Sequence, residues 1–320
     1  MFENLWYIEG VRTALEVCMD VKSGEEVLVV TDSRKLDIAD AFAAVSSSFG
    51  ADTTISCMKP REIDGEEPTE AIAGAMKKAD VVMIPTSKSL SHTDAREEAV
   101  ESGARVASMP GITKKMLATA MTAGYKKIEK KSKKLAKILT DSNKAKISTD
   151  KGTDLILELE GRKGIADTGM LQEKGAWGNL PAGEAYIAPL EGKGRGTIVV
   201  DTSMSGVGKI SEPITIEVVD GKITEIRGKE EAQEFKDMIQ KGDENGDKIA
   251  ELGIGTNEVA TAMGNALIDE KLGGTVHVAF GDSSHIGGCQ MSNIHSDGII
   301  SEPTLKLDET TVLEKGEWKI

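Results

Sequence analysis

Three of the four histidines fall in one stretch, Gly273 to Ile300, where imidazole and carboxylate side chains recur at short spacing. His277 stands among β-branched and apolar residues, which is typical of a buried strand, where an imidazole needs partners for its ring nitrogens. His295 and Asp297 are two residues apart, so both project from one face if the segment is extended. Imidazoles and carboxylates that converge in this way are typical ligands of zinc, cobalt, manganese or iron. The alternative is that these histidines are exposed or capping residues of glycine-rich loops.

Two glutamates stand in settings that are unusual for a solvated charge. Glu184 follows a glycine in NLPAGEAYIAP (179–189), and Glu251 precedes a Gly-x-Gly in AELGIGTN (250–257). Each is a candidate metal ligand or general base. Taken alone, each is also consistent with an ordinary surface glutamate.

Further polar candidates lie outside these segments. His92 and Arg96 in SKSLSHTDAR (87–96) follow a predicted strand, at the edge of a sheet where ligands bind. We interpret them, together with His285 in GDSSHIGG (281–288), as candidate substrate-cleft residues. The alternatives are that Thr93 caps the next helix and that His285 is an exposed loop residue.

The elements that position these residues are predicted by hydrophobic periodicity. The first part of the chain alternates strands with helices, which is typical of βαβ units around a parallel sheet. The strands are expected at 26–31, 53–58, 80–85 and 104–109, and the helices at 2–19, 37–49, 68–79 and 93–102. We predict that residues 1–145 form a Rossmann-like or flavodoxin-like α/β layer sandwich. No G-x-G-x-x-G follows the first strand, so a dinucleotide site is not expected.

In the second part of the chain, the alternation of strands with helices gives way to a pattern of successive strands. A helix with seven lysines and one apolar face is predicted over 125–139, where it would close the first domain. Strands are then expected at 146–149, 153–160, 197–201, 214–219 and 222–226, the last two joined as a hairpin by Asp220-Gly221, and a helix at 229–241. Residues 146–320 are therefore predicted to form an α+β domain that binds the metal.

Composition excludes several classes of protein. The 320 residues carry a net charge of -14, which argues against nucleic acid as a partner. We find neither a signal peptide nor an apolar run of about 18 residues, so we expect a cytoplasmic protein that does not engage a membrane. Three scattered cysteines exclude a disulfide framework and a cysteine-based zinc site.

The series NLPAGEAYIAP, AELGIGTN, GTVHVAFG and NIHSDGII, in this order, resembles the metal-binding half of the aminopeptidase T (thermophilic-type leucyl aminopeptidase) family of metallo-exopeptidases. The resemblance covers the chain from about Gly152 to its end. It implies a homodimeric hydrolase that removes N-terminal residues from short peptides with two divalent ions, which would be cobalt, zinc or manganese. By motif, the implied ligands are Glu184, Glu251, His277, His295 and Asp297, with Glu251 and Glu184 as the catalytic candidates.

The chemistry of the five residues agrees with that resemblance. Three carboxylates and two imidazoles exceed what one tetrahedral ion needs, and they suit two ions about 3.5 to 4 Å apart that activate a water. One departure matters, because the tyrosine expected shortly after His277 is absent. Two alternatives therefore stay open: a mononuclear non-haem iron dioxygenase of the same fold family, which opens dihydroxypyridine rings, and a metal-binding member without hydrolysis.

Overall fold

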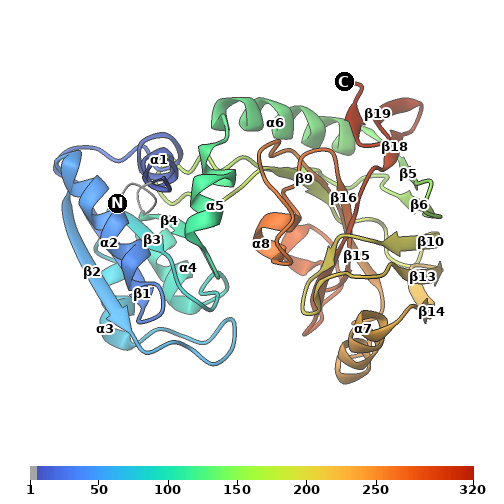
Figure 1. The fold of residues 1–320 in the computed structure, drawn as a ribbon, viewed down its shortest axis with the longest axis horizontal. Coiled ribbons are helices and arrows are strands. Elements are labelled where there is room, and N and C mark those ends of the chain that lie inside the picture. Colours follow the sequence, from blue (N-terminus) through green and yellow to red (C-terminus); the bar gives the residue numbers. More distant parts are fainter. Residues whose placement is uncertain (1–5) are drawn as a thin grey trace. The chain divides into compact units, whose positions relative to one another are not determined.

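The computed structural model describes residues 6–320, so the first part of the predicted helix at 2–19 lies outside the described residues. The chain forms two compact units (Figure 1). Unit 1 comprises the described part of Met1–Tyr125 together with Gly169–Ala182, and unit 2 comprises Lys126–Thr168 with Gly183–Ile320. The helices within residues 6–320 include no candidate for a membrane-spanning segment.

Unit 1 is built on a five-stranded parallel sheet in the order β2-β1-β3-β4-β8. Its strands β1, β3 and β4 are buried at every residue except the first of β1, as expected for a parallel sheet between layers of helices. The strands are β1 Glu26–Asp32, β2 Asp52–Met58, β3 Val81–Ile84, β4 Arg105–Ser108 and β8 Trp177–Asn179. The helices are α1 Ile8–Arg12, a π-helix Thr13–Cys18, α2 Leu36–Ser48, α3 Glu70–Met76, α4 Asp94–Glu101, α5 Lys114–Ala118 and a 3-10 turn Ala120–Thr122. The predicted α/β class with a parallel sheet is confirmed.

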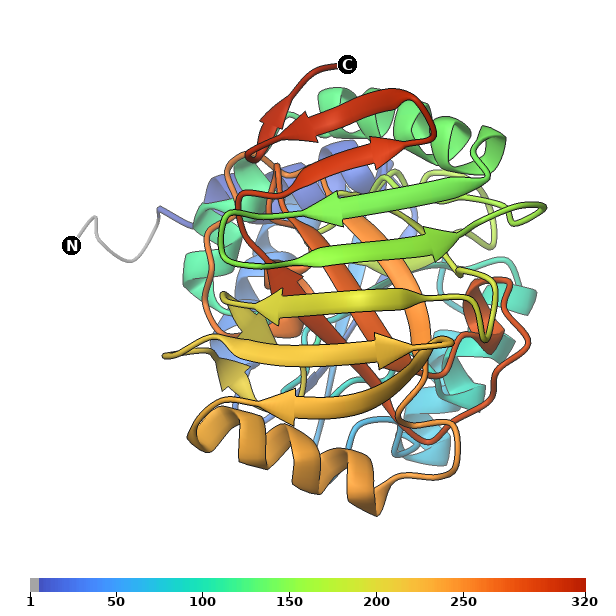
Figure 2. The same cartoon turned by 90° about the vertical axis from the view of Figure 1, so that its right-hand side faces the viewer.

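Unit 2 contains two antiparallel sheets. The eight-stranded sheet runs β14-β13-β10-β6-β5-β18-β19-β20 and the seven-stranded sheet runs β12-β11-β17-β16-β15-β9-β7. Figure 2 shows the eight-stranded sheet face on, with the other sheet crossing behind it at an angle. The strands are β5 Lys144–Ser148, β6 Asp154–Glu158, β7 Ile165–Asp167, β9 Glu184–Ile187, β10 Arg195–Val200, β11 Ser203–Met204, β12 Gly208–Lys209, β13 Ile214–Val219, β14 Lys222–Arg227, β15 Ile249–Gly255, β16 Val276–Gly281, β17 His295–Ile300, β18 Thr304–Leu307, β19 Thr310–Glu314 and β20 Glu317–Trp318.

The helices of unit 2 are α6 Tyr125–Asp141, α7 Glu230–Lys241, α8 Ala266–Asp269 and a 3-10 turn Ser284–Ile286. The hairpin of β13 and β14 turns at Asp220 and Gly221, both with positive φ, as predicted. One apolar core lies between the two sheets and includes Phe235 of α7.

Helix α6 packs its apolar face on unit 2. Leu135 and Leu139 are fully buried in the same core as Ile147 and Leu155. The division by contacts therefore falls after Tyr125 and not after residue 145, because the apolar stripe of the lysine-rich helix is buried against β-structure. The chain also returns to unit 1 at 169–182, where β8 pairs with β4, a crossing that the sequence analysis did not predict.

The packing of α6 yields a prediction. Leu135→Ala removes a fully buried side chain and should lower the free energy of unfolding by about 2 to 5 kcal/mol. The matched control is Lys133→Ala on the same helix. The Lys133 side chain is 64% exposed, so this substitution should change the free energy of unfolding by less than about 0.5 kcal/mol. Urea unfolding followed by circular dichroism measures both, and equal effects would contradict the placement of α6.

Candidate metal centre

The seven-stranded sheet presents two chemically different faces because side chains alternate along each strand. One face packs into the core of unit 2 through Leu252, Ile254, Val276, Val278 and Phe280. The opposite face carries the residues between them. The five residues implied as ligands all lie on this second face: Glu184 on β9, Glu251 on β15, His277 on β16, and His295 and Asp297 on β17.

Small residues alternate with these polar ones across the sheet. The register pairs Gly253 with His277, Gly255 with Glu184, Ala279 with both Glu251 and Asp297, and Gly281 with His295. A Cβ atom on Gly253 would lie 1.9 Å from Nε2 of His277. Glycine at this position therefore provides the space that the imidazole occupies.

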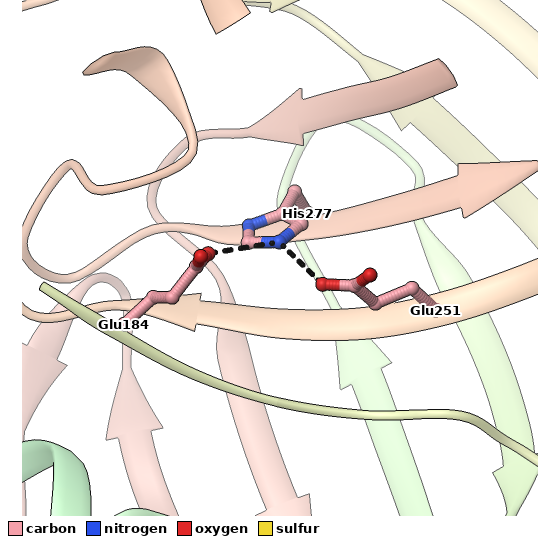
Figure 3. A group of neighbouring side chains, drawn as sticks. All are labelled: Glu184, Glu251 and His277. Carbon is pink, nitrogen blue, oxygen red and sulfur yellow. Dashed lines mark hydrogen bonds and ion pairs between the residues drawn. The ribbon is translucent and has the colours of Figure 1, made fainter. Parts of the chain in front are cut away.

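The five side chains converge in two groups that share Glu251. Glu184, Glu251 and His277 offer ligand atoms within 4.8 Å of one another, and so do Glu251, His295 and Asp297. Nε2 of His277 lies 3.3 Å from Oε2 of Glu184 and 3.3 Å from Oε1 of Glu251 (Figure 3). Nε2 of His295 lies 3.6 Å from Oε2 of Glu251 and 3.4 Å from Oδ1 of Asp297. Each histidine thus faces a different oxygen of Glu251.

The two groups differ in their access to solvent. The side chains of Glu184, Glu251 and His277 are 7%, 8% and 1% exposed, so the inner group is closed. The side chain of His295 is 38% exposed, which opens the outer group to water or to a ligand. A metal site that does chemistry needs such an open position.

The buried acids and imidazoles shift one another's protonation. Burial raises the pKa of Glu184 to about 8, against the opposing charge of Lys271. Burial also disfavours a charged His277, but its hydrogen bond with Glu251 and the charge of Glu184 outweigh this and raise its pKa to about 9. The charge of Asp297 likewise raises the pKa of His295, while His295 holds the pKa of Asp297 below its usual range despite burial. The carboxylates of the cluster therefore favour positive charge on His277 and His295, either as a bound proton or as a metal ion.

Details around the outer group fit a divalent ion. Nδ1 of His295 lies 2.8 Å from the carbonyl oxygen of Asp282, which fixes the ring and leaves Nε2 as the donor to a metal. Ser205 donates to Oδ2 of Asp297 at 3.0 Å, so Oδ1 stays available. In the inner group, the described contact of the buried Oε2 of Glu184 is the ion pair with Nε2 of His277 at 3.3 Å. Imidazole and carboxylate donors without thiolate suit iron, manganese, cobalt or zinc.

Two residues of this region were missed by the sequence analysis. Lys271 is buried, and its ammonium group bonds to Oε1 of Glu184, lies 2.6 Å from Oε1 of Glu270 and lies 3.6 Å from Oδ2 of Asp167. Burial disfavours its charge, but these carboxylates raise its pKa well above the usual value, so it stays a cation. Tyr186 shares the face of Glu184, two residues away on β9, and a signal for it was available in that spacing.

The other predicted cleft residues lie elsewhere. Arg96 is in unit 1, where its guanidinium carbon lies 3.9 Å from the centre of the Trp177 ring and its Nε donates to the carbonyl oxygen of Ser91. The ring of His92 contacts Trp177 edge-on, and Thr93 caps α4, as its alternative interpretation stated. His285 is exposed in the 3-10 turn Ser284–Ile286. None of the three predicted cleft residues belongs to the two groups, and their role in a substrate cleft stays a prediction.

Comparisons with known proteins place this geometry in context. A family model described as NicX, 2,5-dihydroxypyridine 5,6-dioxygenase, matches residues 7–319. Among solved structures, a 2,5-dihydroxypyridine dioxygenase from Pseudomonas putida KT2440 is similar, with a TM-score of 0.80, 18% identity, and coverage of 97% of this chain and 96% of that chain. Wild-type AmpT from Thermus thermophilus gives a TM-score of 0.75 at 15% identity and covers 100% of both chains. At these identities the two structures show a shared fold alone. A comparison with curated protein sequences gives no match.

The place of Gly253 leads to a prediction about metal retention. Gly253→Ala should displace the His277 ring and lower the affinity for a divalent ion at least about tenfold. Gly74→Ala is the control, since a Cβ at this helical position meets no atom within 4 Å and should at most stabilise the protein by about 1 kcal/mol. Metal content after gel filtration measures the difference. If the folded Gly253→Ala protein retained all of its metal, glycine at 253 would not be needed to make room for the His277 ring.

The pKa shifts predict how the metal-free protein responds to pH. The raised pKa of His277 gives a stability contribution that is complete below about pH 6.5 and is lost as pH rises through about 9. The raised pKa of Glu184, at about 8, acts in the same direction. The melting temperature of protein freed of metal with a chelator should therefore decrease as the pH is raised from 6.5 to 9. His277→Gln should make this decrease smaller. A melting temperature that rises over this pH range would contradict the shifts.

Proposed function

The chain belongs to the 2,5-dihydroxypyridine 5,6-dioxygenase family, and from this premise we propose that it is a metal-dependent dioxygenase that opens the ring of a hydroxylated pyridine. The observation that carries the proposal is the family match over residues 7–319, nearly the whole chain. This function is the alternative stated from the sequence. The aminopeptidase interpretation is supported by a similarity of fold at 15% identity.

The residues of the two groups support a role for iron. Glu251, His277, His295 and Asp297 would hold the ion, and two histidines with carboxylates are the donor type of non-haem iron oxygenases. When bound, iron allows dioxygen and an electron-rich ring to react in one complex. In the reaction that the family description names, the bond between ring carbons 5 and 6 breaks and both oxygen atoms of O2 enter the product.

The chain's own residues orient the reactants. The exposed edge of His295 gives a ligand access to the outer group, while the closed inner group excludes water. Asp282 fixes the ring of His295 through its carbonyl oxygen, and Ser205 fixes the carboxylate of Asp297. Burial raises the pKa of Tyr186, so its phenol stays neutral and can donate a hydrogen bond to an oxygen substituent of the substrate. Glu251 is here a ligand of the ion, and Glu184 is the buried partner of Lys271. The hydrolytic roles expected for these two residues belong to the peptidase interpretation.

A second candidate function is favoured by one observation. The two oxygens of Glu251 face different histidines, as they would if this carboxylate bridged two ions. Two ions would suit the hydrolysis of short peptides. Homodimer formation and the absence of nucleic acid partners stay proposals under either function.

Activity separates the two functions. Protein loaded with Fe²⁺ without oxygen should, once oxygen is admitted, consume one O2 per 2,5-dihydroxypyridine, with loss of the ring's ultraviolet absorbance. The same protein loaded with cobalt, zinc or manganese should release no 4-nitroaniline from leucine 4-nitroanilide. Release of nitroaniline without oxygen uptake would overturn the proposal.

Asp297→Ala tests the site itself. Loss of this carboxylate should remove bound iron and lower oxygen uptake by more than about 100-fold, because a ligand is lost from the outer group. Asp150→Ala, an aspartate with an 83% exposed side chain, is the control and should keep both iron and activity. Unchanged iron content in the Asp297 variant would defeat the assignment.

A further inference from the structure

Lys271 places a permanent positive charge against one of the candidate ligands. Its side chain is 3% exposed, and its Nζ atom bonds to Oε1 of Glu184, with Glu270 at 2.6 Å and Asp167 at 3.6 Å. A lysine is rarely buried to this extent unless acids pair with it. The charge of Glu184 is therefore balanced by a group of the protein itself.

Hydrogen bonds and close packing fix the backbone segment that carries Lys271. Its carbonyl oxygen accepts from the amide of Asn257, and its own amide donates to Ile268, at 2.9 and 3.1 Å. The fully buried carboxylate of Asp269 accepts from three successive backbone amides, at 263, 264 and 265. A Cβ on Gly255 would lie 2.1 Å from the carbonyl oxygen of Leu272, so this segment packs directly on β15. The backbone of Lys271 is thus fixed, and its buried ammonium group is held by Glu184, Glu270 and Asp167.

A divalent ion in the inner group would have to share Glu184 with that ammonium. The side chains of the inner group are 8% exposed or less, so solvent would screen little of the repulsion between the two cations. The outer group takes His295 and Asp297 from β17 and Glu251 from β15, and it contains neither Glu184 nor a contact with Lys271 among those described. An ion held there would not compete with the Lys271 ammonium group for a carboxylate.

We propose that Lys271 takes the place of a second metal ion, so that Glu184 is not a metal ligand and the protein binds one divalent ion. This inference deepens the proposed function and rests on it for the identity of that ion. It gives a physical reason why a chain with all five residues of a two-ion ligand set would hold only one ion. Lys271 is thus a positioning residue that sets the number of ions.

Manganese is a suitable probe because Mn²⁺ reports its own environment. Chelated protein is loaded with Mn²⁺ alone, passed through gel filtration, and examined by metal analysis and electron paramagnetic resonance. We expect one Mn²⁺ per chain and the six-line spectrum of an isolated ion. Two ions per chain with an exchange-coupled spectrum would overturn the proposal, whatever the variants do.

Substitutions then test the role of the charge. Lys271→Met should bind two Mn²⁺ per chain, and adding Glu184→Gln to it should restore one. Lys271→Arg keeps the charge and should bind one. Lys315→Met is the matched control, since it removes a lysine paired with Asp150 at 2.7 Å whose side chain is 67% exposed, and it should bind one. A folded Lys271→Met protein that binds one ion would overturn the proposal.

Glu184→Gln in the otherwise unchanged protein provides a test that does not depend on the stability of the lysine variants. It should still bind one Mn²⁺, with a Kd within about threefold of the original, because Glu184 is not a ligand; a loss of Mn²⁺ would refute this. The outcomes also separate the inference from the proposed function. One ion without ring cleavage would reject only the function, and ring cleavage with two ions would reject only the inference.

Discussion

The site depends on one electrostatic constraint: carboxylates that are buried together need positive charge beside them. Glu184, Glu251 and Asp297 are all 8% exposed or less at their side chains, and isolated buried carboxylates are strongly destabilising. The chain meets this need in two ways. Lys271 provides a fixed charge at the inner end, and His277 and His295 provide groups that can either take a proton or bind a metal. The arrangement of the surrounding sheet follows from keeping these groups together.

The seven-stranded sheet satisfies that constraint through its alternation. One face of β15 and β16 supplies Leu252, Val276 and Val278 to the core, so the strands are held firmly from behind. On the other face, glycine and alanine stand opposite the polar residues and leave room for them. The imidazoles and carboxylates therefore rise from rigid strands instead of loops, which limits their motion.

The sequence predicted most of the fold and which side chains converge on one face of the sheet, for reasons that are local. Alternation around His277 and the two-residue spacing of His295 and Asp297 are properties of single strands, and the structure places all three on one face. The buried runs of β1, β3 and β4 likewise identified the parallel sheet. Lys271 was missed because Glu270-Lys271 resembles any exposed charged pair, and its partner Glu184 is 87 residues away. The same is true of β8, whose pairing with β4 depends on a return of the chain that no periodicity encodes.

The distribution of the ligand set over three adjacent strands also has a thermodynamic consequence. Glu251, His277 and the His295 and Asp297 pair come from β15, β16 and β17, so the unfolded chain cannot present them together. An ion that binds them acts as a cross-link across the sheet and stabilises only the folded state. At a free ion concentration of 100 times Kd, this linkage is worth about 2.7 kcal/mol. The supply of metal would thereby set the fraction of unit 2 that is folded at equilibrium, in addition to whether it can react.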